Sequence, residues 1–488
     1  MMDWLPRPGT LLAIAHTLTI LTVLVRVIMK RPATGVALAW ILIVALLPAA
    51  GITLYLLIGE RRIGERRASR IASLTKSFRE IGNAAILQRL TDVQWDRHPP
   101  TARGLDRLGR STIGSPTVCG SRFELISDTQ QCLSQLASDI DAAQRSVLME
   151  FYIWSAGGAA DDVLAAVMRA AQRGVRCRVL IDALGARPWW RTDQPAQLRA
   201  AGVELQKALP VGIFRTFVGR TDLRLHRKIA VIDGDVAWTG SMNLVDPRFF
   251  KQDSGVGEWV DAMMRIHGAA VAPLAGTMLG DWMVETGDCI DRLVEDSGVR
   301  LIEPDGHVDM QVIPSGPGET ADGLLQMLLG LINSAQHELI MTTPYFVPDD
   351  SLLHAVRGAA LRGVDVALVM PENVDSLLTR YASRSYYDEL LDAGVQLYLY
   401  KDGLLHTKSI MVDGTMSMFG TVNLDMRSLW LNYEVALFVY NAEFATELRA
   451  LQQSYIDDSD PVQPDEWASR GYLSQFTENT LRLVSPLL

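Results

Sequence analysis

Two stretches of the chain carry the same chemically active side chains at the same spacing. Both fit the pattern H-x-K-x4-D-x6-G-[ST]-x-N, formed by His226, Lys228, Asp233, Gly240, Ser241 and Asn243 in the first copy and by His406, Lys408, Asp413, Gly420, Thr421 and Asn423 in the second. Six fixed positions over eighteen residues, found twice, are not a coincidence. We therefore interpret the copies as two halves of one site.

The residue types indicate transfer of a phosphoryl group. One imidazole can attack phosphorus and form a covalent phosphohistidine, while the other protonates the departing alkoxide and later deprotonates the incoming alcohol or water. Two ammonium groups and nearby hydroxyl and amide donors can bind a phosphate without a metal. The expected phosphate donors are Lys228, Ser241 and Asn243 with Lys408, Thr421 and Asn423.

Strand geometry separates the aspartates from the other motif residues. If the motif lies on a strand, His226 and Lys228 are two positions apart and share a face. Asp233 is seven positions from His226 and would point the other way. The same parity applies to the second copy. Asp233 and Asp413 belong to the candidate catalytic set by motif, but we expect them to orient neighbours or hold the loop.

A carboxylate is expected to fix the tautomer of each imidazole. Glu434 follows His406 by 28 residues in a probable strand of the second half, and its counterpart in the first half is Asp261, with Glu258 as a second candidate. A metal site is not expected, because the intervening lysine would repel a cation. No cofactor is expected either. The remaining histidines considered are interpreted as surface residues: His98, His267, His307, His337 and His354.

An internal duplication must position these residues. The two copies lie 180 residues apart, and short apolar runs alternate with amphipathic segments in each half. In the first half we expect strands at Val147 to Ile153 and Cys177 to Ile181, and a helix at Asp162 to Arg173. This alternation predicts an α/β fold of two lobes with parallel βαβ units, helices on the sheet faces, and the lobes packed face to face.

The chain of 488 residues is long enough for several domains, and its formal charge of −10 argues against a general nucleic-acid binder. The four cysteines show neither disulfide nor zinc spacing, which favours reduced, intracellular thiols. No residue is charged from Pro8 to Val25 or from Gly35 to Gly59. Each stretch could cross a bilayer as a helix, which predicts a hairpin with two spans. A cleaved signal peptide is the weaker interpretation, because a second apolar stretch follows at once.

Arginines that follow the second stretch place both termini and the catalytic region in the cytoplasm by the positive-inside rule. The expected domains are 1–59 as the hairpin, 60–125 as a basic connector, 126–300 as the first lobe and 301–488 as the second lobe. An insertion of about a dozen residues around Arg215 to Arg224 suits a membrane or headgroup contact, or is an ordinary loop. The tail from Phe476 to Leu488 is either an amphipathic segment on the membrane or a helix docked on the second lobe.

The repeated motif resembles the HKD signature of the phospholipase D superfamily. The flanking residues resemble those of bacterial cardiolipin synthases that have an N-terminal membrane hairpin, through Glu150-Phe151-Tyr152-Ile153-Trp154, Thr343-Pro344-Tyr345-Phe346-Val347-Pro348 and Asn423-Leu424-Asp425-Met426-Arg427-Ser428. The resemblance implies transfer between two phosphatidylglycerol molecules, giving cardiolipin and glycerol. By analogy, His226 would be the nucleophile and His406 the general acid and base.

The resemblance also implies a bacterial inner-membrane protein whose partners are lipids rather than nucleic acids. Two other functions remain open from the residues: a membrane-bound phospholipase D that uses water as acceptor, and a non-catalytic scaffold that binds anionic lipid. A nuclease of the same superfamily fits the acidic charge and apolar N-terminus less well. The sequence does not indicate the oligomeric state.

Overall fold

The computed structural model describes residues 8–30, 34–55, 59, 67–71, 88–211, 220, 222–318 and 322–483. The chain forms two compact units. One comprises residues 1–65 with 211–222, and the other comprises residues 66–210 with 223–488. Most of the predicted insertion, including Arg215, lies outside the described residues, as does the end of the C-terminal tail.

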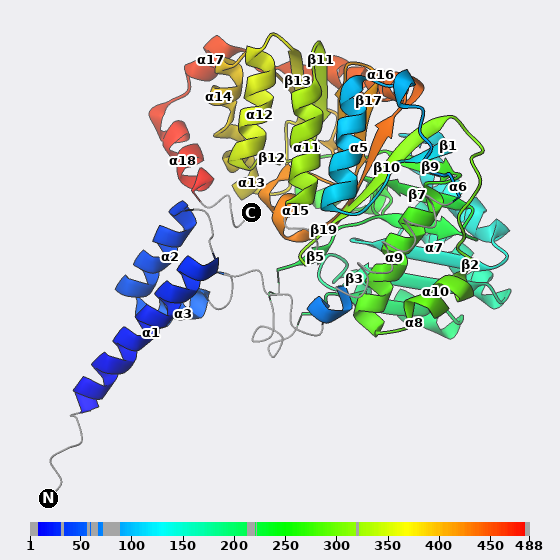
Figure 1. Ribbon diagram of the computed structural model, residues 1–488, viewed down its shortest axis with the longest axis horizontal. Coiled ribbons are helices and arrows are strands. Elements are labelled where there is room, and N and C mark those ends of the chain that lie inside the picture. Colours follow the sequence, from blue (N-terminus) through cyan, green and yellow to red (C-terminus); the bar gives the residue numbers. More distant parts are fainter. Residues whose placement is uncertain are drawn as a thin grey trace, which may run out of the picture. The chain divides into compact units, whose positions relative to one another are not determined.

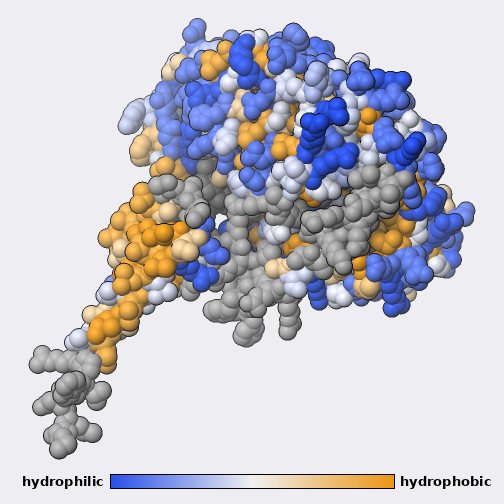
Figure 2. Space-filling model, viewed as in Figure 1, coloured by the Kyte–Doolittle hydropathy of each residue, from blue (hydrophilic) through white to orange (hydrophobic). Residues whose placement is uncertain are grey.

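The N-terminal unit contains α1 (Pro8–Lys30), α2 (Thr34–Leu46) and α3 (Pro48–Leu54). Helix α1 confirms the first predicted span as a helix, since it is long and apolar enough to cross a bilayer. Figure 2 shows hydrophobic residues along its exposed surface. The helices pack through a small cluster of buried residues, Val23, Val27, Val44 and Tyr55.

The second predicted span is wrong as one continuous helix. The chain leaves the helix at Leu47, before Pro48, which has no N–H to donate and clashes with the preceding turn. Helix α3 then bends back on α2. Gly51 permits this close contact, because a Cβ at this position would lie 2.8 Å from the Ile43 carbonyl oxygen. At 13 residues, α2 is shorter than the roughly 20 residues that a span needs.

The second unit is built on one continuous sheet of 16 strands (Figure 1). Its order is β20-β14-β13-β11-β16-β17-β19-β10-β1-β9-β7-β6-β2-β3-β4, with β5 paired to β19. The centre is the antiparallel pair β1 (Val118–Ile126) and β10 (Val308–Ser315), which joins the two halves edge to edge. The expected α/β duplication is therefore confirmed, but the lobes share a sheet and are not packed face to face.

Each half repeats the same elements in the same order. The first half has α6 (Thr129–Ala142), β2 (Ser146–Phe151), α7 (Ala159–Gln172), β3 (Arg176–Asp182), α8 (Gln194–Ala200), β4 (Glu204–Ala208), β6 (Ile229–Ile232), β7 (Val236–Gly240), β9 (Met263–His267), α9 (Val271–Thr286) and α10 (Ile290–Ser297). The second half has α11 (Gly323–Ser334), β11 (Glu338–Thr342), α12 (Asp350–Leu361), β13 (Asp365–Pro371), α14 (Tyr387–Asp392), β14 (Gln396–Tyr400), β16 (Ser409–Val412), β17 (Met416–Gly420), β19 (Asn432–Tyr440) and α16 (Ala442–Asp457). The predicted strands and helix of the first half correspond to β2, β3 and α7.

The strand directions are mixed within each half. Strands β2, β3 and β4 are parallel, as are β11, β13 and β14, which matches the predicted βαβ units. The strands that follow the histidine and lysine of each motif form antiparallel hairpins, β6 with β7 in the first half and β16 with β17 in the second. All residues of β2, β6 and β16 are buried, as expected for strands with helices on both faces.

The predicted connector contributes to the folded unit. Its last residues form β1 in the sheet, and α5 (Pro100–Thr112) packs against α11 of the second half. Two of the arginines that follow the second apolar stretch form hydrogen bonds within this unit. Arg67 donates to Glu285 at 2.9 Å, and Arg70 donates to the Val284 carbonyl oxygen at 2.6 Å.

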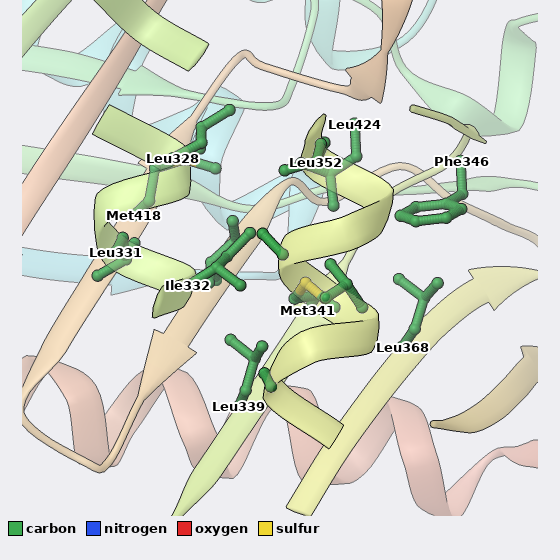
Figure 3. Packing of buried hydrophobic residues seen from close by; sticks show 14 of the residues in the cluster. Leu328, Leu331, Ile332, Leu339, Met341, Phe346, Leu352, Leu368, Met418 and Leu424 are labelled. Carbon is green, nitrogen blue, oxygen red and sulfur yellow. The ribbon is translucent and has the colours of Figure 1, made fainter. Parts of the chain in front are cut away.

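The core of each half lies between the sheet and its helices. Figure 3 shows the second core, in which Leu328 and Ile332 of α11 meet Leu352 of α12 and Met341 of β11.

The C-terminal region adds β20 (Ser459–Pro461), α17 (Pro464–Ala468) and α18 (Tyr472–Arg482). Two further helices, α13 (Leu377–Arg384) and α15 (Met426–Trp430), follow β13 and the second motif.

Candidate active site

The two motifs meet because each half pairs with the other half's carboxylate strand. Strand β5 (Arg224–Leu225) lies parallel to β19, and the His226 N–H donates to the Tyr433 carbonyl oxygen at 2.9 Å. Strand β15 (Leu404–Leu405) pairs with β8 (Trp259–Val260), and the His406 N–H donates to the Val260 carbonyl oxygen at 2.7 Å. The site therefore needs both halves.

Each catalytic imidazole is bonded to a carboxylate from the opposite half. His226 Nδ1 lies 2.8 Å from Glu434 Oε2, and His406 Nδ1 lies 2.7 Å from Asp261 Oδ1. Both carboxylates were expected to serve this purpose, but the sequence suggested partners within each half. An ionised carboxylate only accepts, so Nδ1 of each ring donates and Nε2 is left with its lone pair.

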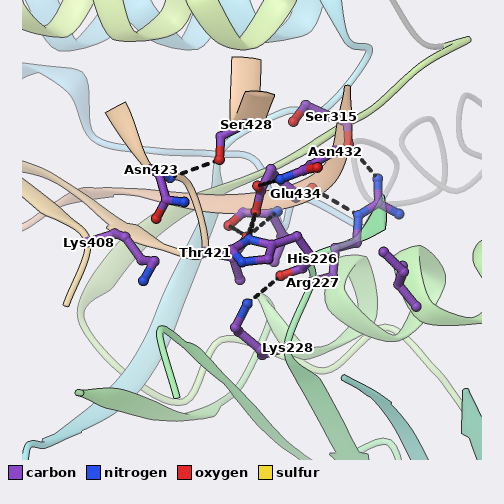
Figure 4. A network of polar contacts seen from close by, with 12 residues as sticks. His226, Arg227, Lys228, Ser315, Lys408, Thr421, Asn423, Ser428, Asn432 and Glu434 are labelled. Carbon is purple, nitrogen blue, oxygen red and sulfur yellow. Dashed lines mark hydrogen bonds and ion pairs between the residues drawn. The ribbon is translucent and has the colours of Figure 1, made fainter. Parts of the chain in front are cut away.

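The hydroxyl groups of the motif support these carboxylates. Thr421 donates its hydroxyl to Glu434 Oε2 at 2.6 Å and accepts from the Val435 N–H (Figure 4). Ser241 accepts from the Ala262 N–H at 3.0 Å, next to Asp261. Neither residue lines the cavity described below. The hydrogen bonds of Ser241 and Thr421 therefore hold the carboxylate strands, and their donation to phosphate stays a prediction.

Two glycines allow this close approach. A Cβ at Gly240 would come within 2.4 Å of the Ala262 carbonyl oxygen, and one at Gly420 within 2.4 Å of the Val435 carbonyl oxygen. A side chain at either position would push the hydroxyl away from its carboxylate strand. The tight approach predicted for these glycines is present in both copies.

The histidines open into one cavity of about 380 Å³ at the carboxyl ends of the parallel strands. His226, His406, Asn243 and Asn423 all line it, as do residues that follow β2, β3, β11 and β13: Tyr152, Trp154, Leu184, Tyr345, Val347 and Asp375. The amide of Asn243 is anchored, because its oxygen accepts from the Ile153 N–H at 3.1 Å. Its buried Nδ2 makes no hydrogen bond and can donate to an anion in the cavity.

The two lysines lie behind the histidines. Lys228 and Lys408 are completely buried and are not part of the cavity wall. Lys228 Nζ donates to the His226 carbonyl oxygen at 2.7 Å (Figure 4). Lys408 Nζ donates in the same way to the His406 carbonyl oxygen. Both pairs lie in a link between two strands rather than within one strand, so the strand argument for a shared face does not apply to them. The lysines instead provide positive charge close to both imidazoles.

Burial dominates the protonation of the site. It lowers the pKa of His226 and of His406 to about 4, although Glu434 and Asp261 act in the opposite direction. Burial also lowers the pKa of Lys228 to about 8 and that of Lys408 well below its ordinary value. Burial alone would raise the pKa of Asp261, but His406 and Lys408 outweigh it and bring it to about 2. Both imidazoles are therefore neutral at pH 7 in this structure.

The motif aspartates bind backbone N–H groups of the loops that lead into the parallel strands. Asp233 accepts from the N–H groups of Gln144, Arg145 and Ser146 at 2.7 to 2.9 Å. Asp413 accepts in the same way from the N–H groups of Gln336, His337 and Glu338, which lead into β11, at 2.8 to 2.9 Å. Neither aspartate lines the cavity. These bonds hold the loop that begins each parallel strand, which is the arrangement that strand parity predicts.

Replacing Asp413 by alanine should therefore reduce stability more than chemistry. Three charge-assisted hydrogen bonds are lost, and the left-handed backbone at this residue, with φ of 50°, becomes less favourable. We expect the free energy of unfolding to fall by about 2–4 kcal/mol, measured by denaturant unfolding. The kcat of the folded fraction should stay within about threefold. A large loss of kcat without loss of stability would contradict this assignment.

Arg227 is a site residue that the sequence reasoning missed. Its Nε donates to the Glu434 carbonyl oxygen at 2.9 Å, and its Nη2 donates to that of Ser315 at 3.1 Å (Figure 4). Its Nη1 bonds to Asp281 at 2.5 Å. Arg227 therefore fixes the strand that carries the partner of His226. The second motif has Thr407 at this position, and that difference between the copies was the only available signal.

Known proteins resemble the chain in sequence and fold. The family described as "Cardiolipin synthase, PLD-like domain" matches residues 136–256 and 328–455, and the family described as "Phospholipase_D-nuclease N-terminal" matches residues 18–60. Cardiolipin synthase A of Erwinia tasmaniensis is 44% identical over 493 residues, covering 100% of this chain and 99% of that protein. The chain belongs to the cardiolipin synthase family. A second member, cardiolipin synthase A of Serratia proteamaculans, is 43% identical and covers 98% of each chain.

A solved structure supports the fold beyond this family. The phosphatidylserine synthase of Haemophilus influenzae Rd KW20 superposes with a TM-score of 0.59 at 15% identity, over 80% of this chain and 100% of that protein. At this identity the likeness concerns the fold alone. It shows that the two-lobed arrangement is also found in a distant protein.

Proposed function

We propose that this protein catalyses phosphatidyl transfer between two phosphatidylglycerol molecules, producing cardiolipin and glycerol. The observation that carries the proposal is the pair of imidazoles in one cavity, each oriented by a carboxylate from the opposite half. Membership of the cardiolipin synthase family supports the same substrate class.

The first half-reaction forms a covalent intermediate on His226. Its Nε2 lone pair attacks the phosphorus of one phosphatidylglycerol, and the bond between phosphorus and the headgroup glycerol oxygen breaks. His406 Nε2–H protonates that oxygen, and glycerol leaves. Burial lowers the pKa of His406. The negative charge of the bound phosphodiester raises it again, so that His406 can carry the proton it donates.

The second half-reaction reverses these roles. His406 accepts the proton of the headgroup hydroxyl of a second phosphatidylglycerol, and the resulting oxygen attacks phosphorus. The bond between phosphorus and His226 breaks, and cardiolipin is formed. One phosphodiester replaces another, so no nucleotide or metal is required. The two buried lysines and the Asn243 amide stabilise the negative charge of the transferred group.

The proposed location is the bacterial inner membrane. Helix α1 supports at least one span, and the match of residues 18–60 to a recognised N-terminal region supports an anchor shared with relatives. We infer that α1 anchors the chain and that the catalytic unit lies in the cytoplasm, as the arginine distribution indicates. Cysteine-labelling of sealed vesicles at exposed Cys289 tests the orientation, since a cytoplasmic thiol reacts only in inverted vesicles.

Product analysis tests the reaction. The purified protein in detergent with labelled phosphatidylglycerol should give cardiolipin and free glycerol in equal amounts. Phosphatidic acid as the main product would instead identify a hydrolase that uses water as acceptor. A repeat with phosphatidylethanolamine added would show, by the release of ethanolamine, whether this lipid can also donate its phosphatidyl group.

The rate should fall as pH rises through about 8. The ammonium of Lys228 has a pKa lowered to about 8 by burial, so its charge is present below that pH and lost above it. His406 must also carry a proton on Nε2 for the first half-reaction, and the bound phosphodiester favours this protonated form although burial lowers the pKa of His406 to about 4. A pH profile of kcat, which reports the complex with substrate, should therefore decline on the alkaline side. A rate that increases through pH 8 would contradict the role of the lysine charge.

A further inference from the structure

Helix α18 exposes its apolar side chains and buries a charged one. Tyr472 is 82% exposed, Leu473 is 76% exposed and Phe476 is 58% exposed, whereas Glu478 is 1% exposed. Glu478 is held from the protein side by Arg384, whose Nε donates to Oε1 at 2.8 Å. A surface helix ordinarily turns its apolar stripe toward the core. The outward apolar face of α18 therefore needs a partner outside the folded unit.

Helix α13 lies beside α18 and continues this face to the cavity (Figure 1). Leu377 and Leu378, in its first turn, are 68% and 49% exposed. Their neighbours Ser376 and Thr379 line the cavity that contains the two histidines. The exposed leucines therefore stand at the entrance of the site. Two other exposed apolar residues border it from the first half: Leu184, which lines the cavity, and Phe249, which precedes the lining residue Phe250.

The charges on α13 suit a negatively charged apolar surface. The helix reads Leu-Leu-Thr-Arg-Tyr-Ala-Ser-Arg from Leu377 and has no acidic residue. Arg384 is paired with Glu478, so Arg380 is the basic residue of this helix that the proposal uses. Helices that lie in the bilayer interface combine apolar and basic residues in this way. Basic side chains close to the surface are also attracted to anionic lipids. Phosphatidylglycerol, the proposed substrate, is such a lipid.

We propose that the exposed faces of α13 and α18 dock in the headgroup region of the bilayer, so that the catalytic cavity opens onto the lipid surface. This inference rests on the proposed function, because it identifies where that function takes its lipid from. The bilayer is favoured over a protein partner because the apolar face is continuous with the entrance of a cavity that receives lipid. Phosphatidylglycerol can then raise its headgroup into the cavity while its acyl chains stay in the membrane.

The first test compares two forms of the substrate. The double variant Leu378→Ser, Leu473→Ser of the full chain is assayed with long-chain phosphatidylglycerol in vesicles and with short-chain phosphatidylglycerol dissolved as monomers. The two serines remove apolar surface that would enter the bilayer, so the rate on vesicles should fall by about tenfold or more. The rate on monomers should stay within about twofold, because the catalytic groups are unchanged. An equal effect on both substrates would overturn the docking proposal.

Leu361 provides the matched control. It is 69% exposed and ends α12, close to where β13 begins, whereas the cavity lies beyond the carboxyl ends of the strands. Leu361→Ser should leave both rates unchanged. If the unmodified protein transfers no phosphatidyl group from either substrate, the proposed function itself has failed. If it does, and only the vesicle rate of the double variant falls, the docking surface is supported.

The second test detects lipid contact directly. In a Cys289→Ser background, Leu473→Cys and Leu361→Cys are each labelled with a fluorophore, and the full chain is reconstituted in vesicles of phosphatidylethanolamine and phosphatidylglycerol. Brominated acyl chains should quench the label at position 473 and leave the label at position 361 bright. Equal emission at the two positions would overturn the proposal. So would a label at 473 that is protected from water without being quenched, since a second copy or another segment would then cover the helix.

Discussion

His226→Ala is expected to lower the rate of phosphatidyl transfer by at least about 10⁴-fold. The imidazole supplies the lone pair that attacks phosphorus, and His406 is the other imidazole among the described residues that line the cavity. His406 is bonded to Asp261 and is assigned to proton transfer. The measurement is the rate of cardiolipin formation from phosphatidylglycerol by the full chain.

The control for this substitution is His354→Ala. His354 is an exposed histidine on α12, so its loss should not change the rate. Thermal unfolding of both variants separates catalysis from stability. A His226→Ala protein that is folded and retains more than about one tenth of the activity would contradict a role for this residue in the chemistry.

Glu434→Gln should lower the rate by about 10²- to 10⁴-fold, the range seen when the carboxylate that orients a catalytic histidine is removed. Glu434 accepts the Nδ1–H of His226 and the Thr421 hydroxyl, and a glutamine amide can present an N–H where the carboxylate oxygen stood. That would favour the other tautomer, with the proton on Nε2 and no lone pair toward phosphorus. Steady-state rates and the imidazole nitrogen shifts in NMR report this change.

The crossed pairing makes the Glu434→Gln effect specific to the first motif. The tautomer and pKa of His226 should change, whereas His406, bonded to Asp261, should keep its nitrogen shifts. Removing the carboxylate should lower the pKa of His226 further, because Glu434 raises it. The matched control is Glu443→Gln, an exposed carboxylate that pairs with His307 on the surface. A change at His406 alone would contradict the crossed arrangement.

The repeated motif was enough to predict most of the site's composition. Equal spacing identified both histidines, both lysines and the amides, and the search for tautomer-fixing carboxylates found Asp261 and Glu434. Strand parity also anticipated that Asp233 would hold a loop. The structure brings these residues together because their placement within each half depends on local spacing, which the backbone of each half preserves.

The failures concern contacts between segments that are far apart in sequence. The exchange of carboxylates depends on how β5 meets β19 and how β15 meets β8, and no local pattern encodes these pairings. The supporting role of Thr421 depends on the pairing of β17 with β19 within the second half. The break of the second apolar stretch is different, since Pro48 was visible and its missing N–H explains the helix end.

Trapping the covalent intermediate tests the central claim most directly. The full chain is mixed with labelled phosphatidylglycerol, quenched within one turnover under conditions that preserve phosphoramidate bonds, and digested for mass spectrometry. The account predicts a phosphatidyl group on the peptide that contains His226, and its absence from Glu434→Gln protein at the same time point. A group found on His406 would reverse the two roles, and transfer with no modified histidine at any time would contradict the two-step mechanism.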